Sequence, residues 1–249
     1  MVCGAVRVNK WKWNVTFTEV VKMKQHSELE NNVKKFIIDH EKGISIDDIQ
    51  HKFRKSNGQN HKMADYLIAD NKIILEMKNL FTDRVGNINE KLNELVKTDD
   101  WLAKNWYGTV RLEDLIKKHP DSERFRHNVM NFAYENIKTK VIKEANKQIC
   151  KTKKVLGLTD SIGGVILLNN NVFSHNSDYL SDAILYLLAT QKYPSVEFVV
   201  YISKLIDKRV DFCVLIDGES KNQDYINWYM NNVFLVNWSS FNQYAIQFS

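Results

Sequence analysis

The 249 residues, 44% hydrophobic and 26% charged, have the composition of a globular protein and can form one large domain or two small ones. The apolar runs at 164–168 and 198–202 are far too short to cross a bilayer, and residues 1–7 lack the apolar stretch of a signal peptide, so we expect no membrane partner. The net charge of +5 permits attraction to phosphates without requiring it, and three scattered cysteines without metal-site or disulfide spacing favour a cytoplasmic protein.

Strand-like alternation marks the N-terminal segment. Apolar side chains recur mostly at every second position over residues 5–24, which is the period of a β-strand. Trp11 and Trp13 share one face of this segment. They are interpreted either as core residues or as a platform on which nucleic-acid bases stack.

Two helices are predicted next. Ser27, followed three residues later by Glu30, has the capping-box pattern of a helix N-terminus, and Gly43 is expected to end this helix. The apolar stripe of the helix consists of Leu29, Val33, Phe36, Ile37 and His40. A shorter helix with Ser45 as its N-cap is predicted over residues 46–54.

The most informative segment is a β-hairpin predicted over residues 63–78. Two apolar strands meet at Asp70-Asn71, and both residue types tolerate the positive φ of a two-residue turn. In that register Asp65 lies directly opposite Glu76, with Cβ atoms about 5 Å apart, and Lys78 points to the same face as Glu76. Two carboxylates this close repel each other unless a charge compensates them, as a divalent cation does. The pattern predicts a metal site, with an ordinary charged strand end as the alternative.

Helical patterns then extend, with breaks, to about residue 154. More than 80 residues separate the strand at Glu76 from the next clear strand, which is more than one crossover helix needs. Residues 80–127 are therefore interpreted as an inserted helical subdomain, and a helix over residues 128–155 is expected to pack on the sheet. The aromatic residues of the insertion form either its core or a lid over the substrate; they are Trp101, Trp106 and Tyr107.

The C-terminal third predicts an α/β alternation. A turn at residues 161–164 is expected to precede these elements: a buried strand at 165–168, a helix at 178–191, and strands at 196–203 and 210–216. The tail over residues 225–248 is rich in aromatic side chains. It is interpreted either as a cover for the core or as the surface of a homodimer.

The hairpin residues resemble a known motif. Asp65, a ten-residue gap and then Glu76-Met77-Lys78 are similar to the motif of the PD-(D/E)XK nuclease superfamily, with Ala64 in place of the proline of its name. The resemblance implies that Asp65, Glu76 and the backbone carbonyl of Met77 bind Mg²⁺, for which Mn²⁺ can substitute. It also implies that Lys78 positions or activates the attacking water.

The resemblance covers roughly residues 26–78 and 128–204. It implies a restriction-endonuclease-like fold, which is an α/β fold with a mixed central sheet flanked by helices. Residues 1–249 are then a single nuclease-like domain, with the 80–127 helical subdomain inserted within it.

Two further site residues are expected from the resemblance. Glu30, on the helix before the hairpin, matches an acidic residue that points at the metal in many members, although a capping role alone explains it equally well. Gln148 matches a glutamine that contacts the substrate phosphate or a metal-bound water. The tyrosine that commonly follows this glutamine four residues later is missing, because Thr152 stands there.

A run of lysines marks one predicted helix, with Glu144 as the single acid among them. They are interpreted either as a solvated helix face or as contacts to a nucleic-acid backbone, the main source of non-specific affinity. The lysines are Lys138, Lys140, Lys143, Lys147, Lys151, Lys153 and Lys154, and the last five are the predicted nucleic-acid contacts.

The implied function is a Mg²⁺-dependent nuclease that hydrolyses phosphodiester bonds. A DNA endonuclease of restriction, recombination or repair type is expected from the family, with RNA as the other substrate class. The alternatives are a non-catalytic nucleic-acid-binding or assembly protein on the same fold, and a structural protein whose hairpin charges are coincidental. Phosphate-binding glycine loops and the motifs of serine hydrolases, zinc proteases and zinc deaminases do not occur in the sequence.

Overall fold

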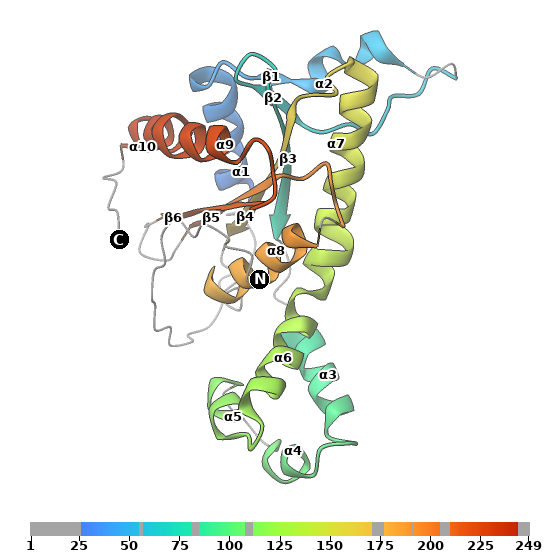
Figure 1. Ribbon diagram of the computed structural model, residues 1–249, viewed down its shortest axis with the longest axis vertical. Coiled ribbons are helices and arrows are strands. Elements are labelled where there is room, and N and C mark those ends of the chain that lie inside the picture. The colour runs from blue at the N-terminus through green and yellow to red at the C-terminus, as the bar shows by residue number, and fades with distance from the viewer. Residues whose placement is uncertain are drawn as a thin grey trace.

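Six strands form one open mixed sheet in the described part of the chain. The computed structural model describes residues 26–54, 57–80, 85–107, 112–170, 177–190, 192–204 and 210–243. The protein is α/β, with helices on both faces of the sheet (Figure 1). The strands predicted over residues 5–24, with Trp11 and Trp13, lie outside the described residues. No helix within the described ranges combines the length and the apolar character needed to cross a membrane.

The strands lie side by side in chain order. Their bounds are Ile44–Ser45 (β1), Tyr66–Ile68 (β2), Ile73–Leu80 (β3), Ile162–Asn170 (β4), Phe198–Lys204 (β5) and Val210–Ile216 (β6). β1, β2 and β3 form an antiparallel unit, β3, β4 and β5 run parallel, and β6 is antiparallel to β5. The change from antiparallel to parallel pairing therefore occurs at β3, the strand that contains Glu76 and Lys78.

One face of the sheet is covered by α1 (His26–Lys35), α9 (Gln223–Tyr229) and α10 (Leu235–Asn242). π-Helical turns extend α1 to His40 and join α9 to α10. The aromatic tail covers the core here, because Phe234 and Trp238 are buried, whereas Trp228 is 54% exposed. The alternative use of the tail as a dimer surface stays a prediction.

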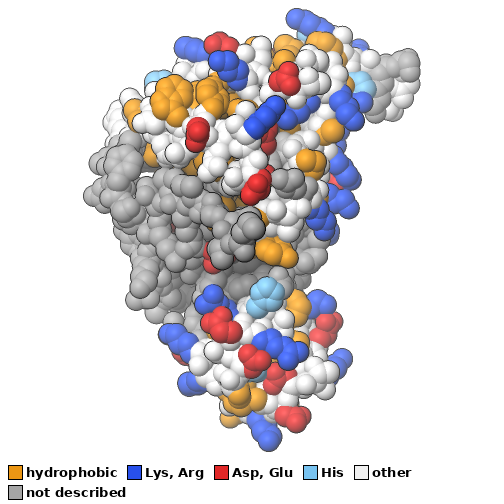
Figure 2. Space-filling view, viewed as in Figure 1, with side chains coloured by type: hydrophobic (Ala, Val, Ile, Leu, Met, Phe, Trp, Pro, Cys, Tyr) orange, Lys and Arg blue, Asp and Glu red, His pale blue; other side chains and the backbone are white. Residues whose placement is uncertain are grey.

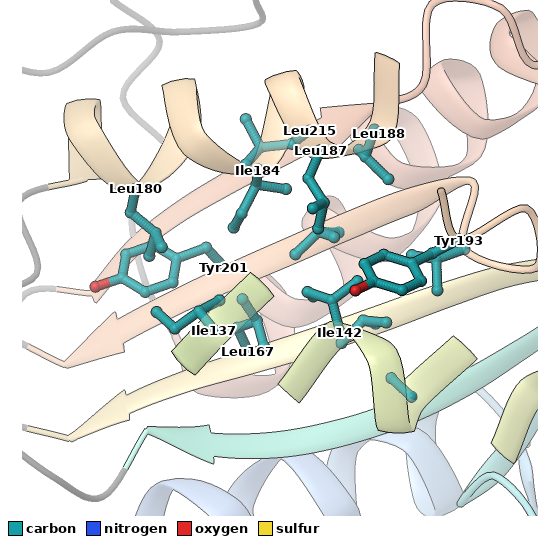
Figure 3. Packing of buried hydrophobic residues seen from close by; sticks show 14 of the residues in the cluster. Ile137, Ile142, Leu167, Leu180, Ile184, Leu187, Leu188, Tyr193, Tyr201 and Leu215 are labelled. Carbon is teal, nitrogen blue, oxygen red and sulfur yellow. The ribbon is translucent and has the colours of Figure 1, made fainter. Parts of the chain in front are cut away.

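The other face is covered by α7 (Lys143–Leu156) and α8 (Ser177–Ala189). Figure 3 shows Leu180, Ile184 and Leu187 of α8 pointing toward Leu167 and Tyr201 on the sheet. All five side chains are buried. Burial on both faces explains why the parallel strands contain nearly continuous apolar runs.

Four further helices gather in a lobe away from the sheet (Figure 1). They are α3 (Val85–Leu95), α4 (Asp100–Asn105), α5 (Leu112–Lys118) and α6 (Ser122–Asn136). A π-helical segment, Ile137–Ile142, joins α6 to α7 without a break. The predicted end of the insertion at residue 127 thus lies inside one continuous helix that belongs to both the lobe and the sheet.

The aromatic residues of the lobe differ in their surroundings. The Trp101 ring lies edge-on to the His119 ring, with centroids 5.0 Å apart. Trp106 donates from Nε1 to Asn93 Oδ1 at 2.7 Å. Trp101 and Trp106 therefore belong to the packing of the lobe itself, whereas Tyr107 is 75% exposed.

The hairpin register predicted from the sequence is confirmed. Leu67 pairs with Ile74 and Ile68 with Ile73, as the alternation and the turn require. Asp70 and Asn71 have φ values of 53° and 65°, and the Lys72 amide donates to the Ala69 carbonyl. The turn therefore places Asp65 and Glu76 at the same level of neighbouring chain segments.

Two predicted boundaries are wrong. Residues 161–164 were expected to form a turn, but β4 begins at Ile162 and both of its glycines lie in the strand. A Cβ on Gly163 would lie 1.8 Å from the Ser195 carbonyl oxygen, and one on Gly164 would lie 2.1 Å from the Phe198 ring. These glycines permit close packing rather than a turn. In the first helix, α1 begins at His26, so Ser27 lies inside the helix rather than preceding it.

The remaining predicted helices are present. The short helix over residues 46–54 appears as α2 (Ile46–Ile49) followed by a 3₁₀ turn, Gln50–Phe53, with Ser45 as its N-cap. The apolar stripe of α1 and its π-helical extension is buried, except that His40 is exposed and meets Phe36 and Phe241 only at the ring edges.

Candidate active site

The site begins where β3 continues past the end of β2. Pairing of the two strands stops at Tyr66 and Leu75, and Asp65 lies just before β2. The Asp65 backbone is fixed on both sides, because its amide donates to the Leu75 carbonyl and its carbonyl accepts from the Ile46 amide. Its side-chain Oδ2 accepts a hydrogen bond from the Met77 amide at 2.7 Å. Asp65 is therefore held against the part of β3 that extends beyond its pairing with β2.

Glu76 and Lys78 lie two residues apart on β3 and point to the same face of the sheet, as predicted. This is the face covered by α7. Glu76 is only 1% exposed, and its Oε1 forms an ion pair with the Lys78 ammonium group. Lys78 Nζ also donates to Gln148 Oε1 on α7 at 3.0 Å. The hairpin and α7, which lies 70 residues further on at Gln148, thus bring Asp65, Glu76, Lys78 and Gln148 together.

Gln148 is the centre of a short hydrogen-bond chain between α7 and the hairpin. It is 7% exposed, and its Nε2 donates to the Met63 carbonyl at 3.0 Å. One helical turn further on, the Thr152 hydroxyl accepts from the Ala64 amide at 2.8 Å. α7 is therefore bonded both to the segment before Asp65 and to Lys78.

Burial dominates the electrostatics of the two carboxyls. Loss of water, followed by the nearby charge of Asp65, raises the pKa of Glu76 to about 8, against the opposing attraction of Lys78. Burial also raises the pKa of Asp65, and the hydrogen bond from the Met77 amide opposes that rise. Two carboxyls in this condition favour any cation that neutralises them.

A divalent cation fits the groups that are present. Glu76 Oε2 is buried and has no hydrogen-bond partner among the described residues. The backbone of Met77 faces the β2 side, as its bond to Asp65 requires, so its carbonyl oxygen lies beyond the last paired residue of β2. Within the described ranges no three His, Cys, Asp or Glu side chains converge. Asp65, Glu76 and the Met77 carbonyl would therefore bind the cation with water completing its shell, an oxygen set suited to Mg²⁺.

Glu30 lies near this group but is bonded elsewhere. Its Oε2 accepts from Asn79 Nδ2 at 2.6 Å, and Asn79 alternates to the face of β3 opposite Lys78. The negative charge of Glu30 still reaches Asp65 and contributes to its raised pKa. The metal-directed role of Glu30 stays a prediction, and the contact it makes is with the α1 side of the sheet.

The lysines of α7 differ in exposure. Lys143, Lys147, Lys151 and Lys154 are exposed, and Figure 2 shows basic side chains along the edge where α7 runs. Lys153 is only 15% exposed and lies 3.7 Å from Glu197 Oε1, so it already has an acidic partner within the protein.

One basic residue near the site was not expected from the sequence. Lys62 Nζ lies 3.6 Å from Glu144 Oε2 on α7, and its charge lowers the pKa of Glu76. Its position three residues before Asp65 is a weak signal, because the contact depends on how α7 packs. Asn79 was missed for a similar reason.

Comparison with protein-family models, curated proteins and solved structures finds no match for this chain. Its function is therefore inferred from the geometry of Asp65, Glu76, Lys78 and Gln148 and from the resemblance of the motif.

Proposed function

We propose that this protein is a Mg²⁺-dependent nuclease of the PD-(D/E)XK type that hydrolyses DNA. The observation that carries the proposal is the convergence of Asp65, Glu76, Lys78 and Gln148, with one buried oxygen of Glu76 left without a hydrogen-bond partner. A buried, charge-strained group of this kind is typical of functional sites.

The connectivity around the site supports the proposal. An initial helix, α1, is followed by the antiparallel strands β1, β2 and β3, then by α7, and then by β4 parallel to β3. This is the order expected for a restriction-endonuclease-like core, with α3 to α6 as the inserted subdomain. The wide separation of the three cysteines in the sequence fits the proposed cytoplasmic location.

Each residue has a distinct proposed role. Asp65, Glu76 and the Met77 carbonyl bind the cation, which when bound lowers the pKa of a water and neutralises charge on the scissile phosphate. Lys78, held by Gln148, orients the attacking water and stabilises negative charge that develops on the phosphate. Gln148 keeps the Lys78 ammonium group directed at the site.

The partner class follows from charge. The exposed lysines of α7, the helix that also contains Gln148, are proposed to contact the phosphate backbone of the substrate. DNA is proposed over RNA on the expectation from the family alone.

Metal binding is the first test. Calorimetry with Mn²⁺ should show binding by the wild type and at least about tenfold weaker binding by Asp65→Ala, because one of two carboxylate ligands is lost. Asp224→Ala is the matched control, since Asp224 is an exposed acid in the first turn of α9. Equal Mn²⁺ affinities of the wild type and Asp65→Ala would contradict the assignment of Asp65 as a metal ligand.

Cleavage is the second test. Plasmid, linear, branched and single-stranded DNA, and RNA, are incubated with the protein and Mg²⁺ or Mn²⁺. We expect cleavage of at least one DNA form by the wild type and by Asp224→Ala, and none by Asp65→Ala. Binding of these substrates without cleavage under any condition would favour the non-catalytic nucleic-acid-binding protein instead.

A further inference from the structure

We propose that Thr152 is a positioning residue that fixes the direction of Asp65, an inference that rests on the proposed function. Thr152 lies outside the Asp65, Glu76 and Lys78 motif and stands where the family commonly has a tyrosine, four residues after Gln148. Its side chain is fully buried on α7, one turn after Gln148, and its hydroxyl contacts Ala64, the residue before Asp65 in the segment that leads into β2.

The Thr152 hydroxyl makes two hydrogen bonds. It accepts from the Ala64 amide at 2.8 Å and donates to the Gln148 carbonyl at 2.9 Å. Donating within its own helix fixes the hydroxyl rotor, so a lone pair is directed at Ala64. Ala64 is 2% exposed, and a buried amide in this position needs a partner.

The bond matters because of the residue that follows Ala64. Consecutive amides are held by different elements: the Ala64 amide by α7 and the Asp65 amide by Leu75 of β3. Together they fix the two peptide planes on either side of Ala64, and the second plane ends at the Asp65 Cα, from which the side chain extends toward the Met77 amide. A ligand must be held to within about 0.5 Å for productive binding, so loosening these planes would displace the carboxylate.

Gln148 and Thr152 act from one helix face. Residues four apart on a helix are neighbours, so the pair presents two contacts in line. Gln148 holds Lys78 and the Met63 carbonyl, while Thr152 holds Ala64. One face of α7 therefore sets both the carboxylate and the ammonium group of the site.

Matched substitutions separate positioning from packing. Thr152→Val keeps the shape and removes the hydroxyl, whereas Thr152→Ser keeps the hydroxyl and removes a methyl group. Ile149→Val, on the same helix and fully buried, loses a methyl group from the core without touching the hairpin bond. A residue that only fills space would make Thr152→Val harmless and Thr152→Ser harmful.

The direct readout is amide hydrogen exchange at Met77 in metal-free protein, measured by NMR, because that amide donates to Asp65. We expect Thr152→Val to speed exchange at Ala64 and Met77 at least about tenfold relative to amides of β5, which report global opening. Mn²⁺ affinity should fall about tenfold or more, as for other residues that support a ligand. Thr152→Ser should stay within about threefold of the wild type in both, and Ile149→Val should speed all amides alike.

If the Met77 amide exchanges as slowly in Thr152→Val as in the wild type, the inference is wrong. Failure of the wild type to bind Mn²⁺ would defeat the proposed function, and Met77 exchange alone would then decide whether Thr152 positions Asp65.

Discussion

Two glutamate–lysine ion pairs, one on the sheet and one on the helical lobe, consist of the same groups, but the pKa of the glutamate is shifted in opposite directions. In α3, Lys91 Nζ lies 2.7 Å from Glu94 Oε2, and the side chain of Glu94 is 61% exposed. On β3, Lys78 forms an ion pair with Glu76, which is 1% exposed. The hydrogen bond and charge of Lys91 lower the pKa of Glu94, whereas burial raises that of Glu76 to about 8.

The difference shows what burial does to an ion pair. In water the lysine decides the pKa of its partner, because solvation of the carboxylate is hardly changed. Inside the protein, loss of water and the adjacent Asp65 outweigh the attraction of Lys78. The pair on α3 stabilises a helix slightly, while burial of the pair on β3 opposes stability, as is common at functional sites and in keeping with the proposed function.

The largest expected effect is on the cleavage rate, which should depend on Lys78 of β3 and not on Lys91 of α3. Lys78→Ala should lower the cleavage rate at saturating substrate by about 10²–10⁴-fold, because a group that acts on the water or the transition state is lost. Mn²⁺ and substrate affinities should change little, which is the signature of an interaction made in the transition state. Lys91→Ala should cleave like the wild type, as measured in the same single-turnover assay.

Lys78→Arg sharpens this result. A guanidinium group is broad and does not exchange its proton near neutral pH, so it should restore little of the rate. Equal cleavage by the wild type and Lys78→Ala would remove Lys78 from the mechanism.

The second effect separates the two glutamates by stability. The folded pKa of Glu76, about 8, lies above its ordinary value of 4.5, so the stability it contributes is fully present below pH 4.5 and is lost as the pH rises through 8. Glu76→Gln removes this titration. In EDTA at pH 8.5 the variant should be more stable than the wild type by about 2–4 kcal/mol in urea unfolding, with the difference shrinking toward pH 5.

Mn²⁺ should reverse the order, because it stabilises only a protein that binds it. Glu94→Gln is the control and should not gain stability at high pH, since the pKa of Glu94 is lowered. A Glu76→Gln variant that is less stable than the wild type at pH 8.5 without metal would contradict the assignment of a strained carboxylate.

The smallest effect concerns the exposed lysines. Lys147→Ala and Lys151→Ala should each lower the slope of log affinity against log salt concentration by up to about one unit, independent of DNA sequence. Fluorescence anisotropy over a salt series measures this slope. Lys91→Ala, an exposed lysine on the lobe, should leave it unchanged, and unchanged slopes in all three would make the α7 lysines a solvated helix face.

The sequence contained enough to predict the hairpin because its determinants are local. Alternation of period two and a turn tolerant of positive φ fix the register of Leu67 with Ile74, and that register places Asp65 beside Glu76. The alternation of strands and helices in the C-terminal third of the chain was predicted because it too depends on local hydrophobic periodicity. The glycines of β4 led to the wrong prediction of a turn, because the close approach of Ser195 and Phe198 that requires them leaves no pattern in the local sequence.

The parts of the site that were not predicted depend on contacts between distant segments. Thr152 meets Ala64 across 88 residues, and Gln148 was singled out only by its resemblance to a family motif. Glu30 was expected from the family resemblance to point at the metal, yet its bond to Asn79 depends on how α1 packs on the sheet. Local periodicity contains no information on such packing.

The unbroken helix from Ser122 to Leu156 connects the lobe to the sheet, so the number of residues in the helix sets the rotation of the lobe about the helix axis. Each residue added to an α-helix turns everything beyond it by about 100° and advances it by about 1.5 Å. One extra residue at the start of α7 would therefore rotate the lobe around the helix axis to a different side of the sheet, while hardly changing its distance. The length of this helix is thus constrained to single-residue accuracy even where its side chains face solvent.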